Sequence, residues 1–260
     1  MNKIFWLLSV GLSLVACNDN KSTDSPKNTD LIIQNLKGMV QRTEETSYKV
    51  DSTGKIGAMD SCCASIQEFD EKGYNPKYFS KDINGITKEE ATYTRFEGGQ
   101  MKEVVMMTNG KKSSSISIQI GKDGKYISAK SFGADGKMDG YYADLNENEF
   151  GSLTGGKFYK TDSTLKYSFT AFFDKAINTG SQTDSAGKMI SENKLKINDR
   201  GDVIEMNSTI ITKDSAIHKK ETYTYDSYDD KGNWTQKTTY NEKGKPVKLV
   251  KRTIIYYKNE

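Results

Sequence analysis

A four-residue turn recurs along this chain and constrains its fold more than any other feature. Each copy begins with Asp or Asn and ends with Gly three residues later. The first side chain accepts hydrogen bonds from nearby backbone N–H groups, and the glycine adopts the left-handed conformation that closes a type I turn with a bulge. Such turns join adjacent antiparallel strands, so the sequence predicts a series of β-hairpins. The six copies end at Gly54, Gly73, Gly187, Gly201, Gly232 and Gly244.

Further turn signals support the same interpretation. A second form occurs at residues 121–125 and 133–137, and Asn109-Gly110 is typical of a two-residue hairpin loop. Because a side chain strains a left-handed position, we expect Val at Gly201 or Gly244 to destabilise the fold more than a replacement of Gly140, which lies outside the turns.

The segments between turns alternate apolar and polar residues. Clear cases are 115–120, 165–173 and 222–225. A period of two places the two sets on opposite faces of a sheet. We therefore expect about a dozen antiparallel strands with mostly sequence-local pairing. The stretch 141–155 breaks the alternation and is expected to form a loop or a short helix.

A short helix is predicted before the first strand. Asp30 stands at the N-cap position, Leu31, Ile32, Ile33 and Leu36 follow at helical spacing, and Gly38 ends the segment. An entering strand is the alternative for so short a window. The predicted fold class is mainly all-β: an extended antiparallel meander of repeated hairpins with room for this one helix. Since 35% of the residues are hydrophobic and 28% are charged, we expect a thin sheet with much solvated surface.

The first seventeen residues resemble the signal peptide and lipobox of bacterial lipoproteins. Lys3 precedes an apolar run, and Leu14-Val15-Ala16-Cys17 closes it with small residues before a cysteine. The resemblance implies cleavage before Cys17 and acylation, palmitate included, of that residue. It divides the chain into a signal peptide (1–16), a lipidated cysteine with a flexible polar tether (17–30) and a β repeat domain (31–260).

Several phrases in the β domain resemble the RHS/YD-type repeats of bacterial envelope proteins and MORN-like variant repeats. They are FDEKGYN (69–75), INDRGDV (197–203), YDDKGNWTQKTTYNEKGKPV (228–247) and LKGMVQRTEETSYKV (36–50). The likeness extends over most of residues 36–257. It implies a scaffold of hairpins and supplies no catalytic residue.

The charge balance argues against one class of partner. The chain has 38 Lys and Arg residues against 35 Asp and Glu residues, a net charge of +3. Nucleic-acid binding would require a clustered basic face, so no nucleic acid is expected as a partner. No cofactor motif is present, and no cofactor is expected.

The adjacent pair Cys62 and Cys63 has two interpretations. A vicinal disulfide would suit an exported protein in an oxidising compartment. Because neighbouring cysteines reach disulfide geometry only with unusual backbone strain, two reduced thiols or a small buried pair are favoured.

Other candidate residues carry little chemistry. His218 is the only histidine, two lysines follow it, and no nucleophile elbow accompanies it, so a solvated position is favoured. Asp226, Asp229 and Asp230 cluster but lack the alternating oxygen ligands and distal Glu of a calcium loop. No metal site is therefore expected.

Trp234 lies just past a turn, close in sequence to Tyr223 and Tyr225. An exposed platform of such rings could stack on a sugar or on a partner strand. The alternative, which the low apolar content favours, is that these rings supply the core of a thin sheet.

The sequence favours a non-enzymatic lipoprotein of the bacterial envelope. It would be anchored to a membrane through the lipid on Cys17, and its scaffold would bind an envelope protein or a surface glycan. Asn18 in place of Asp after Cys17 favours the outer membrane under the lipoprotein sorting rule. The alternatives are a periplasmic carrier of a lipid or other apolar ligand and a hydrolase acting on wall or glycan. A continuous apolar concavity would favour the carrier, and a cleft with converging carboxylates would favour the hydrolase.

Overall fold

The computed structural model of the protein describes residues 29–51, 53–148, 151–174 and 176–258. Its elements in chain order are α2 (Asp30–Ile33), β1 (Val40–Val50), β2 (Ile56–Glu68), β3 (Lys77–Lys81), β4 (Thr87–Arg95), β5 (Met101–Thr108), β6 (Lys111–Ile120), β7 (Tyr126–Gly133), β8 (Met138–Glu147), β9 (Leu153–Lys160), β10 (Leu165–Phe173), β11 (Ile177–Asp184), β12 (Met189–Ile197), β13 (Val203–Ile211), β14 (Ala216–Tyr228), β15 (Trp234–Asn241) and β16 (Pro246–Tyr256).

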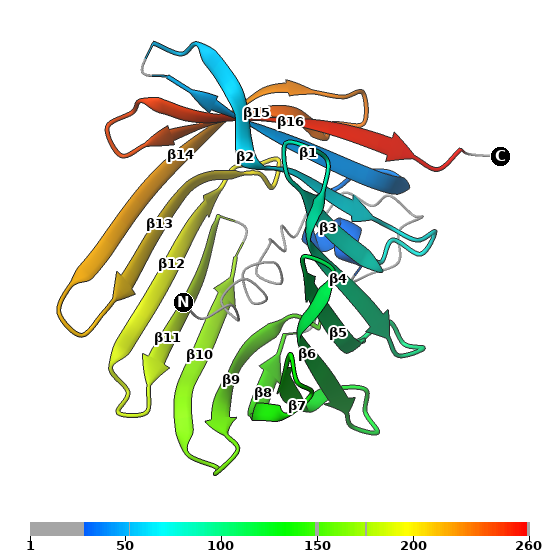
Figure 1. The fold of residues 1–260 in the computed structure, drawn as a ribbon, viewed down its shortest axis with the longest axis vertical. Helices are drawn as coiled ribbons and strands as arrows, with labels where there is room; N and C mark the ends of the chain where they lie inside the picture. Colours follow the sequence, from blue (N-terminus) through cyan, green and yellow to red (C-terminus); the bar gives the residue numbers. More distant parts are fainter. Residues whose placement is uncertain (1–28, 52, 149–150, 175, 259–260) are drawn as a thin grey trace.

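The strands form one closed antiparallel barrel. Each strand pairs with its neighbours in sequence, and the first strand also pairs with the last, as Figure 1 shows with blue β1 beside red β16. The β1–β16 register extends from Val40 opposite Tyr256 to Lys49 opposite Lys248. The predicted fold class, an antiparallel meander of hairpins with one short helix, is confirmed. The expected number of about a dozen strands is too low, because the described residues form sixteen. Whether the sheet closes was left open by the sequence, and the pairing of β1 with β16 closes it.

The predicted turns are confirmed. In the six Asp/Asn-x-x-Gly copies the glycine has a φ between 69° and 87°. Its N–H donates to the carbonyl oxygen of the first residue at 2.9–3.0 Å. The Asp70 side chain shows the other half of the turn, since its Oδ1 accepts from the N–H groups of Lys72 and Tyr74 at 3.0 and 2.9 Å. Two further copies were not recognised in the sequence: Asp82 to Gly85 joins β3 and β4, and Asn148 to Gly151 joins β8 and β9.

The stretch 141–155 is a correction to the sequence analysis. It contains the end of β8 and the start of β9 instead of a loop or helix. Its alternation is interrupted because the register shifts between Ala143 and Asn146, and Asp144 has a φ of 52°. This bulge inserts a residue between two regular strand segments.

The predicted helix is present as α2, but its cap differs. Thr29 is the N-cap residue and makes no side-chain capping bond, while Asp30 is the first helical residue. Leu31 and Leu36 are buried with Val40 and Phe69, against Ile254 and Tyr256. Since Thr29 is also buried, the folded part includes the last two residues assigned to the tether. The described part of the chain contains no helix with the length and hydropathy of a membrane span.

The main core lies on the inner face of the middle strands. Ala129, Tyr142, Phe158, Tyr167 and Phe169 form one buried cluster. Tyr167 and Phe169 belong to the alternating set predicted for 165–173, so that prediction of a buried face is confirmed.

Candidate functional site: an apolar cavity inside the barrel

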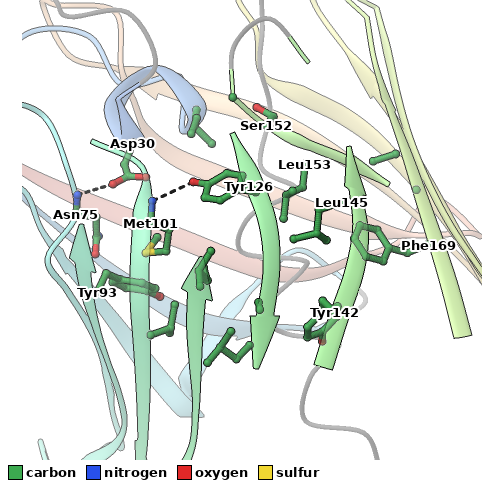
Figure 2. Close-up of a pocket in the computed structure, with 18 of the residues that line it drawn as sticks. Asp30, Asn75, Tyr93, Met101, Tyr126, Tyr142, Leu145, Ser152, Leu153 and Phe169 are labelled. Carbon is green, nitrogen blue, oxygen red and sulfur yellow. Dashed lines mark hydrogen bonds between the residues drawn. The ribbon is translucent and has the colours of Figure 1, made fainter. Parts of the chain in front are cut away.

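A cavity of about 300 Å³ lies inside the barrel, between α2 and the strands from β2 to β12. Figure 2 shows its two sides, with Asp30, Asn75 and Tyr93 on one and Leu145, Leu153 and Phe169 on the other. This volume is at the lower end of the range of small-molecule pockets, about 300–1,000 Å³. Its apolar lining consists of Ile33, Met101, Val104, Ile116, Ile118, Ala129, Tyr142, Leu145, Leu153, Phe169 and Ala171.

Strand register brings the apolar wall together. Val104 pairs with Ile116, while Ile118 pairs with Ala129, which in turn pairs with Tyr142. Directly paired residues project to the same face of a sheet. The sequence alternation therefore becomes one continuous apolar surface across β5, β6, β7 and β8.

A β-bulge and a glycine shape the side of this wall formed by β8 and β9. Leu145 lines the cavity although it is three residues from Tyr142, which also lines it. The bulge at Asp144 makes this possible, because an inserted residue reverses the facing of those that follow. Gly156 leaves space for the side chains of Leu145 and Phe169, since a Cβ at this position would lie 2.7 Å from Leu145 Cδ2 and 2.8 Å from Phe169 Cε1.

A hydrogen-bonded tyrosine pair stiffens the floor of the cavity. Tyr142 and Tyr167 are both buried, and their hydroxyl oxygens lie 3.1 Å apart. The ring of Phe158 stacks on that of Tyr167, with centroids 5.2 Å apart. Burial raises the pKa of both hydroxyls, so both stay protonated and uncharged at physiological pH.

The opposite end of the cavity is polar and organised by one carboxylate. Asp30 Oδ2 accepts hydrogen bonds from the backbone N–H of Asn75 and from Arg95 Nη2, both at 2.6 Å. Arg95 also donates from Nη1 to Gly99 O at 2.9 Å. Its guanidinium carbon lies 4.8 Å from the ring centroid of Tyr74. Burial raises the pKa of Asp30 despite the opposing effect of Arg95.

Three side-chain atoms at this end are buried and lack a hydrogen-bond partner among the described residues. They are Gln67 Oε1, Asn75 Oδ1 and Arg95 Nε. All three residues line the cavity, and Asn75 is only 6% exposed. Buried polar groups in proteins are almost always paired, so these atoms mark a place for a polar group of a ligand or for water.

A second group of charged and aromatic residues lies on the inner face where the barrel closes. Trp234 is 7% exposed and packs on Tyr225, with ring centroids 5.8 Å apart. Arg252 Cζ lies 3.4 Å and Lys237 Nζ 4.7 Å from the Trp234 ring centroid. Arg252 also pairs with Glu45 on β1.

This group contains the residues predicted as a binding platform. Trp234 and Tyr225 pack together, whereas the Tyr223 hydroxyl donates to Glu221 at 3.1 Å. Since Trp234 is buried, these rings form part of the barrel interior instead of an exposed platform.

No family model and no curated protein matches this chain. Among solved structures, a porin-like protein from Bacteroides uniformis is similar, with a TM-score of 0.53 and 11% identity over 83% of this chain and 96% of that chain. A porin-like protein from Bacteroides vulgatus matches with a TM-score of 0.37 and 12% identity over 85% of this chain and 99% of that chain. A Tc holotoxin pore from Photorhabdus luminescens matches with a TM-score of 0.30 and 12% identity over 81% of this chain and 11% of that chain. At these identities the likeness concerns the fold alone. Only the Bacteroides uniformis protein, with a TM-score above 0.5, supports a shared barrel fold.

The remaining predicted residues are dispersed. His218 is exposed, and its Nδ1 lies 3.1 Å from Thr209 Oγ1. Asp226 accepts from Thr238 at 2.7 Å, and Asp229 accepts the backbone bonds of its own turn. Within the described ranges no group of three potential metal ligands occurs.

The cysteine predictions concern parts that the structure leaves largely undescribed. Cys17 lies outside the described residues. Cys62 and Cys63 belong to β2 by backbone, and their side chains lie outside the description.

Sequence reasoning missed the polar end of the cavity. Asp30 was interpreted as a helix cap, and Gln67, Asn75 and Arg95 were not singled out. Their approach depends on the pairing of β2, β3 and β4 and on the docking of α2, for which the sequence carries no short-range signal. The apolar wall was partly visible, since Ile116 and Ile118 were identified as one face of a strand.

Proposed function

We propose that this protein is a lipid-anchored envelope protein that binds an apolar or amphipathic small molecule inside its barrel. The observation that supports this proposal most is the continuous apolar wall around a cavity of about 300 Å³. A concave apolar site with a few polar groups at one end is the usual form of a small-molecule site. Of the functions considered from sequence, the carrier fits this geometry best.

The charged outer face of the barrel favours membrane attachment through the lipid on Cys17 over insertion of the barrel itself into the bilayer. On β12, Ser191 and Asn193 line the cavity, so the exposed Glu192 and Lys194 lie on the outer face. Glu205 on β13 pairs with Lys196 and Lys220 across neighbouring strands at 3.2 and 3.0 Å. A Lys side chain facing lipid costs about 2–4 kcal/mol near the bilayer midplane, and a Glu side chain costs less, so such a face favours water. The lipobox at Cys17 would supply the membrane attachment, and the barrel likeness to a porin-like protein supports an envelope location.

Hydrolysis is not favoured by this cavity. Asp30 is the one carboxylate among its described lining residues, and Arg95 pairs with it. Glycoside hydrolysis usually requires two carboxyl groups about 5–9.5 Å apart. We therefore propose that the protein is not an enzyme, and a panel of peptide, ester and glycan substrates should show no turnover.

Ligand binding can be tested with the full chain carrying Cys17→Ser, which cannot be acylated at that position. An apolar fluorescent probe should gain emission on binding. Ala171→Trp would fill the cavity and should abolish this gain, whereas Lys194→Trp adds the same ring on the outer face and should preserve it. Equal emission with both variants, at equal fold stability, would place the probe elsewhere and contradict the proposal.

A second candidate is a scaffold that binds an envelope protein. Ile83 and Ile86, in the turn between β3 and β4, are 59% and 56% exposed. Two large apolar side chains on one loop favour a protein contact. Crosslinking in intact cells should lose a specific partner when both are changed to Ser, while probe binding stays unchanged.

A further inference from the structure

The polar end of the cavity carries information about the ligand's head group. Gln67 Oε1 and Asn75 Oδ1 are hydrogen-bond acceptors, and Arg95 Nε is a donor. None of the three has a partner among the described residues, although each is buried. Leaving a buried polar atom unpaired is unfavourable, so a ligand that pairs with these three atoms gains affinity there.

These groups are held in place by bonds that do not use the free atoms. Asp30 binds the backbone N–H of Asn75 and the Nη2 of Arg95, and Gly99 O accepts from Arg95 Nη1. The guanidinium of Arg95 is therefore positioned before a ligand arrives, and the backbone that carries the buried Asn75 side chain is fixed as well. Preorganised groups lose little entropy on binding, which makes them effective for recognition.

The charge at this end is balanced. Asp30 and Arg95 are the only carboxylate and the only guanidinium or ammonium group among the described cavity-lining residues, and they pair at 2.6 Å. A ligand carboxylate would face the Asp30 carboxylate and two amide oxygens. A ligand ammonium would face the Arg95 guanidinium. An uncharged head group avoids both repulsions.

We infer that the cavity recognises an amphiphile whose uncharged head carries hydroxyl groups, as in a monoacylglycerol. Its hydroxyls donate to Gln67 and Asn75 and accept from Arg95 Nε. The acyl chain lies along the apolar wall formed by Val104, Ile116 and Phe169. Because a hydroxyl both donates and accepts, this pairing is possible for either orientation of the two side-chain amides. This inference rests on the proposed function and adds the chemical class of the ligand.

A competition experiment with four ligands of equal chain length tests the head group. Monolauroylglycerol, laurate, dodecyltrimethylammonium and dodecane would each displace the fluorescent probe from the full chain carrying Cys17→Ser, below their aggregation concentrations. We expect monolauroylglycerol to bind at least about tenfold more tightly than the other three. Equal affinity of all four, or a preference for laurate, would overturn the head-group inference while apolar binding stands. Failure of the probe and all four ligands to bind would overturn both proposals.

Two variants test whether the preference for monolauroylglycerol depends on Gln67 Oε1 and Asn75 Oδ1. Gln67→Met keeps the length of the side chain and removes its acceptor, so the affinity for monolauroylglycerol should fall about tenfold with that for dodecane unchanged. Asn75→Leu provides a second variant that retains the backbone bond to Asp30. Gln119→Met is the matched control, because Gln119 is exposed on β6 and bonded to Ser128 Oγ. An unchanged preference in folded Gln67→Met and Asn75→Leu proteins would contradict the inference.

Discussion

Arg252 on the last strand and Glu45 on the first strand lie directly opposite each other and form an ion pair inside the barrel. Arg252 donates from Nε and Nη2 to Glu45 Oε1 at 2.9 and 2.5 Å. Burial alone would raise the pKa of Glu45, but Arg252, Lys237 and Lys248 lower it. The carboxylate is therefore charged where β1 and β16 close the sheet, and its partner is required to compensate that charge.

Arg252→Ala should destabilise the barrel by about 3 kcal/mol, because it leaves the mostly buried Glu45 without its main partner. Urea denaturation measures the loss. Lys157→Ala is the control, since its pair with Asp144 is solvent-exposed and its removal should change the urea midpoint little. Similar losses for the two variants would mean that the Glu45–Arg252 pair between β1 and β16 stabilises the barrel no more than a surface ion pair does.

Gly140→Ala should be more damaging than Gly244→Ala, which reverses the expectation from sequence. A Cβ at Gly140 would lie 2.2 Å from Tyr159 O and 2.7 Å from Phe158 Cζ. Gly244 has a φ of 69° and no heavy atom within 4 Å of the added Cβ, so its cost is the backbone term of about 1–2 kcal/mol. Thermal melts of both variants decide the order, and a more stable Gly140→Ala protein would contradict the packing of β8 on β9.

The outer cluster around Glu205 should contribute a pH-dependent part of the stability. Hydrogen bonds from Asn207, Lys220 and Lys196 lower the pKa of Glu205 from 4.5 to about 2. A lowered folded-state pKa stabilises the fold above the unfolded value and loses that effect as the pH falls through the folded value. The stability difference between wild type and Glu205→Gln should therefore be constant above pH 5 and decrease from about pH 4.5 towards pH 2. A constant difference across this range, measured by denaturation at each pH, would contradict the assignment.

Trp234→Ala should reduce folding stability by about 3–5 kcal/mol, the usual cost of removing a large buried ring. Trp234 is buried under Arg252 and beside Tyr225, as expected if this ring belongs to the core and is not an exposed platform. Phe172→Ala is a suitable control, since Phe172 is exposed and its loss should change the denaturation midpoint little. A fully stable Trp234→Ala protein would show that the interior stacking contributes nothing.

Cys17→Ser should abolish acylation and move the protein from membranes to unprocessed or soluble fractions. The reason is that residues 14–17 resemble a lipobox, and this resemblance implies that the thiol of Cys17 is the acceptor. Labelling cells with a fatty-acid analogue measures this directly. Equal label in wild type and variant would remove the lipid anchor from the proposal.

The sequence by itself determined the local structure of this protein. Asp or Asn followed three residues later by Gly specifies each turn, and the alternation of residues such as Ile116 and Ile118 specifies which face is buried. Both signals are short-range, because a turn is set by four residues and a face by a period of two.

Only the tertiary structure decided that the sheet closes and what its interior contains. Closure depends on contacts between residues far apart in sequence, such as Glu45 with Arg252, and no local pattern reports them. The polar end of the cavity has the same origin, since Asp30 reaches Asn75 and Arg95 only after α2 docks across the paired strands β3 and β4. The bulge at Asp144 and the close packing at Gly140 also depend on neighbouring strands, which is why the sequence alone misjudged both positions.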